Sequence, residues 1–171
     1  MTEVAQNAPS AAVNMAELAG KYLTFVLANE EYGIEILHAQ EIIGMVSVTP
    51  VPRTPEFVRG VINLRGKVIP TVDLRRKFGM ETVEDTERTC IVVVQVEGGG
   101  QKMTIGFVVD EVSEVLDIAA EDIEAPPSFG TGLDTNYILG MAKTKDSVKI
   151  LIDIDKVLVT EEIGQIQEDM G

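Results

Sequence analysis

The amino-acid sequence predicts an all-β fold with short helices, organised as two small β-barrels of related topology. Three observations lead to this prediction. Short runs of β-branched and aromatic residues alternate with turn residues along most of the chain. The same succession of features occurs twice. The chain has 171 residues and is 45% hydrophobic, which is enough material for one ordinary domain or two small ones with a core.

Two hairpins are expected in the first half of the chain. Residues 22–27 and 32–36 are β-branched and aromatic runs separated by an Asn-Glu-Glu turn. Residues 58–64 and 67–72 are similar runs around a tight Arg-Gly turn. Residues 37–43 combine apolar with helix-tolerant residues, which predicts a short helical turn after the first hairpin.

The segments that follow each hairpin are expected to be short and irregular. Pro50, Pro52 and Pro55 interrupt any regular element between the two hairpins. After the second hairpin, Asp73 is placed to N-cap a short helix that runs to Phe78, and the next residue is a glycine that can end it.

The second half of the chain repeats the first. Residues 32–43 align with residues 105–116 at a shift of 73, and residues 60–78 align with residues 140–158 at a shift of 80. The matched pairs include Gly33 with Gly106, Glu41 with Glu114, Gly60 with Gly140, Arg65 with Lys145, and Asp73 with Asp153. Two matches in the same order favour two related barrels over the chance resemblance that any all-β chain can show.

The repeat suggests a division of the chain into parts. We expect a disordered N-terminal tail at 1–20, barrel one at about 21–88, barrel two at about 89–160, and an acidic C-terminal tail at 161–171. Barrels of about 70 residues are marginal alone, so they should share apolar surface or exchange elements. A groove between them would suit a binding module.

Composition excludes several function classes. The net charge of −14 disfavours nucleic-acid binding, which needs cationic surface. The lone cysteine rules out an internal disulfide framework. The sequence contains neither a long apolar run nor a recognisable secretory signal, so we expect a cytoplasmic protein without membrane insertion.

The inventory of catalytic residues is small. His38 and Cys90 are the single histidine and cysteine, and both lie in runs that look buried. A Cys-His pair stays open as an alternative, although a free cysteine most often packs as a small apolar residue. Zinc ligands at suitable spacing and phosphate-binding motifs are missing from the sequence. Asp153 and Asp155 do not continue into a calcium loop, so we expect no catalytic residue, metal or cofactor.

Charge is distributed unevenly along the chain. Residues 53–77 hold seven basic and two acidic residues, a net +5, and residues 81–124 hold twelve acidic and two basic residues, a net −10. One basic and one acidic face would suit oriented contact with charged protein partners. A solvated surface with uneven charge is the alternative.

Three segments together resemble the CheW family of chemotaxis coupling proteins. Residues 31–43 (EYGIEILHAQEII) resemble its first signature, and residues 60–75 (GVINLRGKVIPTVDLR) resemble its second and most specific one. Residues 106–116 (GFVVDEVSEVL) resemble the third, so the resemblance covers about 21–160. It implies two intertwined, five-stranded SH3-like barrels and no catalysis.

The resemblance also implies partners and site residues. Proteins of this family are adaptors that couple the cytoplasmic hairpin tips of chemoreceptors to the regulatory domain of the histidine kinase CheA, in arrays on the inner face of the membrane. The protein-binding positions carried over are Ala39, Glu41, Gly60, Arg65 and Val115. For Arg65, a contact with a receptor carboxylate and an internal, inter-barrel ion pair with Glu41 both stay open.

Alternative functions also remain open at this point. A general peptide-binding β module would bind short extended peptides without a double-barrel partner. A coupling protein of a paralogous, non-motility chemosensory pathway would share the fold and the site. A small enzyme would depend on His38 or on the acid-rich region.

Overall fold

The structure, a computed structural model, describes residues 19–98, 101–125 and 137–157, which form two β-sheets and short helices. The expected all-β class is therefore confirmed. In chain order the elements are β1 (Gly20–Leu27), β2 (Glu30–Glu35), η2 (Ile36–His38), β3 (Ala39–Gly44), β4 (Val58–Leu64), β5 (Lys67–Asp73), α2 (Leu74–Lys77), β6 (Cys90–Gly98), β7 (Gln101–Val109), β8 (Glu111–Ile118), η3 (Ala120–Asp122), β9 (Ile123–Glu124), β10 (Ile138–Lys143), β11 (Val148–Ile152) and α3 (Ile154–Val157).

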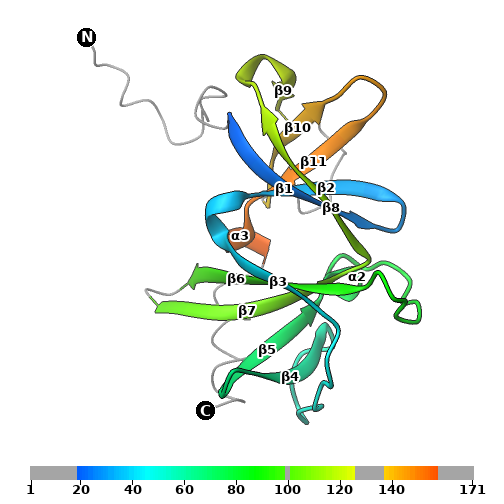
Figure 1. Ribbon diagram of the computed structural model, residues 1–171, viewed down its shortest axis with the longest axis vertical. Coiled ribbons are helices and arrows are strands. Elements are labelled where there is room, and N and C mark those ends of the chain that lie inside the picture. Colours follow the sequence, from blue (N-terminus) through cyan, green and yellow to red (C-terminus); the bar gives the residue numbers. More distant parts are fainter. Residues whose placement is uncertain (1–18, 99–100, 126–136, 158–171) are drawn as a thin grey trace.

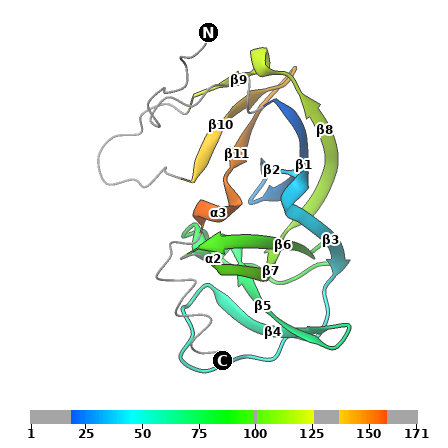
Figure 2. The ribbon, with the colours of Figure 1, turned by 90° about the vertical axis from the view of Figure 1, so that its left-hand side faces the viewer.

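The strands divide into two sheets that lie one above the other in Figures 1 and 2. Sheet A has the order β8-β1-β2-β11-β10-β9, and sheet B has the order β3-β6-β7-β5-β4. In sheet B, Thr49 in the connection after β3 pairs with Val61 of β4, which links the two ends of the sheet. This closure protects edges that would otherwise be exposed, as expected for a small barrel.

The predicted repeat is confirmed by the strand order. At the shifts read from the sequence, β3, β4, β5 and β7 correspond to β8, β10, β11 and β2, and β6 takes the place of β1. With these substitutions, the order β8-β1-β2-β11-β10 becomes the order of sheet B. Gly33 pairs with Leu151 in the parallel pair of sheet A, and Gly106 pairs with Thr71 in that of sheet B. The shift of 73 relates Gly33 to Gly106 and the shift of 80 relates Thr71 to Leu151, so the two parallel pairs are equivalent in the repeat.

The expected division into 21–88 and 89–160 does not separate the two sheets. The hairpin of β1 and β2 lies in sheet A with β8–β11, and the hairpin of β6 and β7 lies in sheet B with β3, β4 and β5. Each half of the chain therefore places its first hairpin in the sheet built mostly by the other half. The two barrels are intertwined, as predicted, but neither is a continuous stretch of chain.

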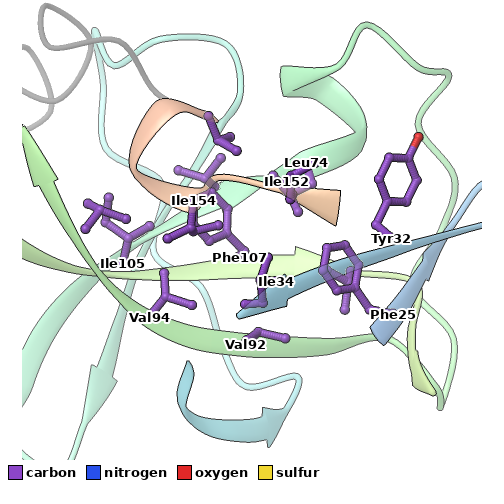
Figure 3. Packing of buried hydrophobic residues seen from close by; sticks show 14 of the residues in the cluster. Phe25, Tyr32, Ile34, Leu74, Val92, Val94, Ile105, Phe107, Ile152 and Ile154 are labelled. Atoms are coloured by element: carbon purple, nitrogen blue, oxygen red, sulfur yellow. The ribbon is translucent and has the colours of Figure 1, made fainter. Parts of the chain in front are cut away.

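The largest hydrophobic cluster lies between the sheets and uses both exchanged hairpins. Phe25 and Ile34 come from the first hairpin, and Val92 and Phe107 come from the second (Figure 3). The helical segment α3 adds Ile154 to the same cluster. Burial of these side chains, each worth about 1.5–3 kcal/mol, is possible only when both sheets are formed, so the halves depend on each other for stability.

Alternation along the exchanged strands supplies the other two cores. On β1, Leu23 and Phe25 face the shared cluster, whereas Tyr22 packs with Leu151 on the other face of sheet A. On β6, Ile91 and Val93 likewise pack on the far face of sheet B, as the period of two in a strand requires.

The predicted helical turn at 37–43 is mostly wrong. Only Ile36–His38 form a helical turn, and Ala39–Gly44 form strand β3. Burial alternates along β3, with every second side chain less exposed, and β3 pairs with β6 over its length. Tertiary pairing therefore overrides local helix tolerance here.

The predicted cap at Asp73 is confirmed and is repeated in the second half. The Asp73 carboxylate accepts hydrogen bonds from the Arg75 and Arg76 N–H groups at the start of α2. The Asp73 N–H donates to the Phe57 carbonyl at 2.7 Å, and the Asp153 N–H donates to the Tyr137 carbonyl at the same distance. Both aspartates thus tie a short helix to the residue that precedes the first strand of its own hairpin.

Both predicted tails lie outside the described part of the chain, apart from residues 19 and 20, where Gly20 begins β1. Among the described residues, no helix has the length and apolar character needed to span a membrane.

Candidate protein-interaction site

The β4–β5 turn holds Arg65 at an exposed tip. Arg65 and Gly66 have φ values of 51° and 88°, and the side-chain oxygen of Asn63 accepts a hydrogen bond from the Gly66 N–H at 2.8 Å. Positive φ at both central residues is the geometry of a type I′ hairpin turn, which matches the twist of the flanking strands. The guanidinium therefore projects from a rigid loop.

Arg65 forms an ion pair with Glu41 of β3. Arg65 Nη1 donates to Glu41 Oε2 at 3.1 Å, and Nη2 donates to Oε1. The hydrogen bond from Arg65 lowers the pKa of Glu41 below its usual value. The two side chains stand at the surface, so water screens the pair and a partner carboxylate can replace Glu41.

Of the alternatives left open for Arg65, the internal pair with Glu41 is present, but it does not join the two sheets. Glu41 lies on β3, and Arg65 lies in the turn that follows β4. Strands β3 and β4 are the two edges of the same sheet, sheet B. The ion pair therefore spans the line along which sheet B closes. Its opening would leave the packing between the sheets unchanged.

Ala39 and Val115 lie on different sheets. Ala39 begins β3 and packs, partly buried, against the shared cluster between the sheets. Val115 lies on β8 opposite Leu23, and its side chain is 51% exposed. The structure brings Arg65 and Glu41 together and leaves Val115 apart from them, on sheet A.

Gly60 has a structural reason for being a glycine. Its φ is +147°, and a Cβ atom there would lie 2.1 Å from the Thr49 carbonyl oxygen. The β3–β4 connection crosses β4 at this point, and the Thr49 and Val61 backbones exchange two hydrogen bonds of 2.9 Å. Gly60 is thus buried beneath a crossing backbone, and any effect on a partner would be transmitted through the fold.

Sequence reasoning missed the most exposed large apolar side chain in the described part of the chain. Leu37 of η2 is 89% exposed, and Ile42 of β3 is 46% exposed. The sequence pattern groups Leu37 with the apolar residues of the predicted helical turn at 37–43, where periodicity predicts burial. Exposed apolar side chains on neighbouring segments are typical of protein contact surfaces.

The expected basic face is largely neutralised. Counting only pairs between described residues, four of its seven basic residues pair with carboxylates: Arg59 with Asp73 and Asp85, Arg65 with Glu41, Arg75 with Asp110, and Arg76 with Asp73. Three of these acids lie outside the basic window. The charge runs therefore serve mainly to pair with each other inside the molecule, and the prediction of an open basic face is wrong at these positions.

Asp110 connects the two sheets. Its carboxylate accepts hydrogen bonds from Arg75 Nε at 2.8 Å, from Arg75 Nη2 at 2.6 Å and from the Ala28 N–H at 2.9 Å. Burial acts to raise the pKa of Asp110, but the hydrogen bonds from Arg75 and Ala28 lower it overall. Arg75 belongs to α2 after sheet B and Ala28 to the β1–β2 turn of sheet A, so this contact sets how the sheets meet.

The structure separates the histidine from the cysteine. Cys90 pairs with Gly44 at one end of β3, whereas Ala39, next to His38, pairs with Val94 four residues further along β6. Four residues of strand span about 13 Å, which is too far for a Cys-His dyad. Burial also raises the pKa of the Cys90 thiol, so its reactive thiolate is disfavoured.

The aspartates considered as a cation site have other partners. Asp153 accepts a hydrogen bond from the Asp155 N–H at 3.0 Å, and Asp155 accepts one from the Glu97 N–H at 2.9 Å. Within the described ranges, no group of three or more His, Cys, Asp or Glu side chains could hold a metal ion.

Taken together, these features define a class of protein. Two interlocked β-barrels share a core and present a turn-mounted arginine and isolated exposed apolar side chains, which is the construction of a small protein-binding scaffold. The chain belongs to the CheW family, because the model of the CheW-like domain matches residues 21–162. The family resemblance stated from the sequence is confirmed.

Known relatives match over most of their length. The chain is 42% identical over 157 residues to the chemotaxis protein CheW of Klebsiella aerogenes, covering 89% of this chain and 92% of that protein. It is 31% identical over 153 residues to the chemotaxis protein CheW of Rhizobium meliloti, covering 90% and 96%. The crystal structure of the scaffolding protein TtCheW from Thermoanaerobacter tengcongensis superposes with a TM-score of 0.69 at 42% identity, covering 78% of this chain and 88% of that one.

Proposed function

We propose that this chain is a non-catalytic adaptor that couples the cytoplasmic tips of chemoreceptors to the regulatory domain of the histidine kinase CheA. The observation that carries the proposal is the 42% identity to a chemotaxis protein CheW over about nine tenths of both chains. The solved relative named a scaffolding protein has the same fold, which agrees with a binding role rather than a catalytic one. Work at receptor arrays would place the chain on the cytoplasmic face of the membrane.

The geometry supports Arg65 as the residue that contacts a partner carboxylate. A planar guanidinium on a rigid turn can form two parallel hydrogen bonds with a carboxylate. In the free chain Glu41 takes that role, so the arginine is already oriented when a partner arrives. Ala39 and Val115 would add apolar contact on either side of the junction between the sheets, and Gly60 would act by holding the crossing backbone in place.

The first experiment is complex formation with the regulatory domain of a CheA kinase from the same cell. Size-exclusion chromatography of the mixture at two salt concentrations should show a co-eluting complex. Two folded proteins that elute separately at tens of micromolar would contradict the coupling role. Binding of short extended peptides without such a complex would instead support a general peptide-binding module.

The second experiment tests Arg65 at the receptor surface. Arg65→Ala should weaken association with a receptor tip fragment by about tenfold, since a charge-assisted pair is lost, and should leave the thermal unfolding curve unchanged. Lys67→Ala is the matched control, because Lys67 is an exposed cation two residues away that forms no ion pair with any described residue. Equal effects of the two substitutions would show that only overall charge matters. Unchanged association of the Arg65→Ala variant would refute the assigned role.

A further inference from the structure

An acidic loop lies between α2 and β6. This loop, residues 81–87, carries four acidic side chains and runs irregularly beside α2 (Figure 1). It belongs to neither sheet. It is nevertheless attached at defined points, because Arg75 Nη1 donates to the Glu81 carbonyl at 2.8 Å and the Thr86 N–H donates to Thr89 Oγ1 at the same distance.

The strongest attachment is between Asp85 and Arg59 of β4. Arg59 Nη1 and Nη2 each donate to one oxygen of the Asp85 carboxylate at 2.9 Å, which is a two-bond guanidinium–carboxylate contact. On its inner side, Arg59 Nε donates to Asp73 at 2.9 Å. The hydrogen bonds that Arg59 donates to Asp85 are the largest contribution that raises the pKa of Arg59, so the guanidinium stays charged.

The two carboxylates on Arg59 differ in how freely they can leave. Asp73 is 4% exposed and caps α2, so its removal would disturb the fold. Asp85 is 38% exposed and sits on a loop without strand pairing. The Nη1 and Nη2 atoms of Arg59 therefore form a carboxylate-binding position, and Asp85, which fills it in this structure, is the carboxylate that a partner can replace.

A second cation next to it has spare binding capacity. Arg76 of α2 is 38% exposed; its Nε lies 3.8 Å from Asp73 and its Nη1 donates to the Glu56 carbonyl at 3.3 Å, so both contacts are long. Arg76 lines a surface hollow of about 380 Å³ together with Arg59 and three carboxylates, those of Asp73, Glu84 and Asp85, of which the last two belong to the acidic loop. Arg76 also lines a neighbouring hollow beside Glu56. Both hollows are open to solvent along the acidic loop.

We propose that Arg59 and Arg76 form a binding site for an acidic segment of a protein partner, and that Asp85 occupies this site as a built-in competitor in the free chain. An incoming carboxylate would replace Asp85 on the outer edge of Arg59, and a neighbouring acidic side chain would reach Arg76. The exchange replaces one carboxylate on Arg59 with another, so its net cost is the loss of the intramolecular contact with Asp85. The site is separate from Arg65 and Glu41 and goes beyond the coupling role.

The net charge of −14 limits where such a partner can bind. An acidic segment is repelled by the chain as a whole, but at an ionic strength of 0.15 M charges more than about 8 Å apart are largely screened. Within that distance, displacement of the loop removes Glu84 and Asp85 from the lining and leaves Arg59 and Arg76 beside Asp73, whose carboxylate caps α2. Tests therefore belong at that ionic strength, where the general repulsion is weak.

The test uses the full chain and the loop itself as a probe. A fluorescent peptide with the sequence of residues 80–88, blocked at both ends, is titrated with the protein and followed by polarisation. Asp85→Asn removes the internal competitor and should tighten peptide binding by about tenfold, the factor for one charge-assisted contact. Glu87→Gln is the matched control, because Glu87 is an acid of the same loop that forms no ion pair with any described residue.

Three outcomes decide the proposal. A gain with Asp85→Asn, no gain with Glu87→Gln and loss of the gain in Asp85→Asn combined with Arg76→Gln would support it. Equal gains with Asp85→Asn and Glu87→Gln would reduce the effect to general charge and overturn it. No gain with a folded Asp85→Asn protein would make the loop contact purely structural and would also overturn it. Since neither receptor nor kinase is used, failure here leaves the coupling function untouched.

A measurement on the wild-type chain covers the case in which Asp85→Asn does not fold. Saturating the unaltered protein with the peptide should speed hydrogen exchange of the backbone amides in residues 81–87, because the loop is displaced. A scrambled peptide of the same composition should speed it less. Unchanged exchange at millimolar peptide would overturn the proposal.

Discussion

Replacement of Gly60 by alanine should destabilise the protein strongly. A Cβ atom at this position would lie 2.1 Å from the Thr49 carbonyl oxygen, 2.7 Å from the Thr49 carbonyl carbon and 2.9 Å from Pro50 Cα. All three are backbone atoms, so no side-chain rotation relieves the overlap. The φ of +147° is in addition a conformation that residues with a Cβ rarely adopt.

The magnitude follows from these two costs. A strained backbone conformation costs about 1–3 kcal/mol, and overpacking against a fixed neighbour costs about 1–3 kcal/mol. Relief would require the two hydrogen bonds between Thr49 and Val61 to open, at about 1 kcal/mol each. The free energy of unfolding should therefore fall by about 2–6 kcal/mol, a large part of the roughly 5–15 kcal/mol that holds a typical domain together.

Urea unfolding followed by circular dichroism measures this loss directly. Gly44→Ala is the control, because Gly44 lies on the neighbouring edge strand, a Cβ there meets nothing within 4 Å, and its φ is not positive. The control should stay within about 0.5 kcal/mol of the wild type. If Gly60→Ala also unfolds within 1 kcal/mol of the wild type, the crossing of the β3–β4 connection over β4 is not as tight as described, and the structural explanation of this glycine fails.

Three further predictions concern titratable groups. Asp110→Asn should lower the free energy of unfolding by about 1–2 kcal/mol at pH 7, discounted for partial exposure. Because the pKa of Asp110 is lowered in the folded chain, its contribution is present above about pH 4 and is lost as the pH falls below that value, so the difference between wild type and variant should shrink steadily below pH 4; a constant difference would contradict this. Burial, with a smaller effect of Glu35, raises the pKa of Tyr22 to about 12, so stability should be lost between about pH 10 and 12, and Tyr22→Phe should remove the last step of the tyrosinate absorbance titration; a step that is complete by pH 10.5 would argue against it. Burial raises the pKa of Cys90, so its reaction with a disulfide reagent at pH 7.5 should be at least about tenfold slower in the folded than in the denatured chain, and equal rates would contradict the half-buried position.

Local chemistry was enough to predict the hairpins and the caps. The turn at Arg65 and Gly66 and the cap at Asp73 each depend on residues within three positions of one another, and the structure has both. The repeat was visible because glycines and aspartates recur where the backbone needs them, at close packing beside Gly33 and Gly106 and at the helix caps. Such constraints act on single positions and leave a direct trace in the sequence.

The partner of each hairpin could not be predicted in the same way. A hairpin shows an apolar face, but that pattern does not say which half of the chain will cover it. The exchange of β1–β2 with β6–β7 is decided by packing between segments some 70 residues apart, so the two sheets do not coincide with the two stretches 21–88 and 89–160. The partners of the charged residues could not be predicted for a related reason, since Arg75 and Asp110 lie side by side only after the fold has formed.

Comparison of the two halves separates what the fold needs from what it leaves free. Matched positions that remain alike, such as Asp73 and Asp153, do the same structural work twice. The repeat shift of 73 aligns Leu37 with Asp110, but their roles differ. Asp110 joins the two sheets, whereas Leu37 projects into solvent.

The turn residues Arg65 and Lys145 diverge in the same way. Arg65 pairs with Glu41, whereas Lys145 forms no ion pair with any described residue, although Glu114 is the counterpart of Glu41. The fold forms with either arrangement, since the two sheets share the same order of corresponding strands. The exposed side chains that only the first half carries, Leu37 and the paired Arg65 and Glu41, are therefore free to be set by a partner, and they mark the first half's share of the surface as the place to look for partner specificity.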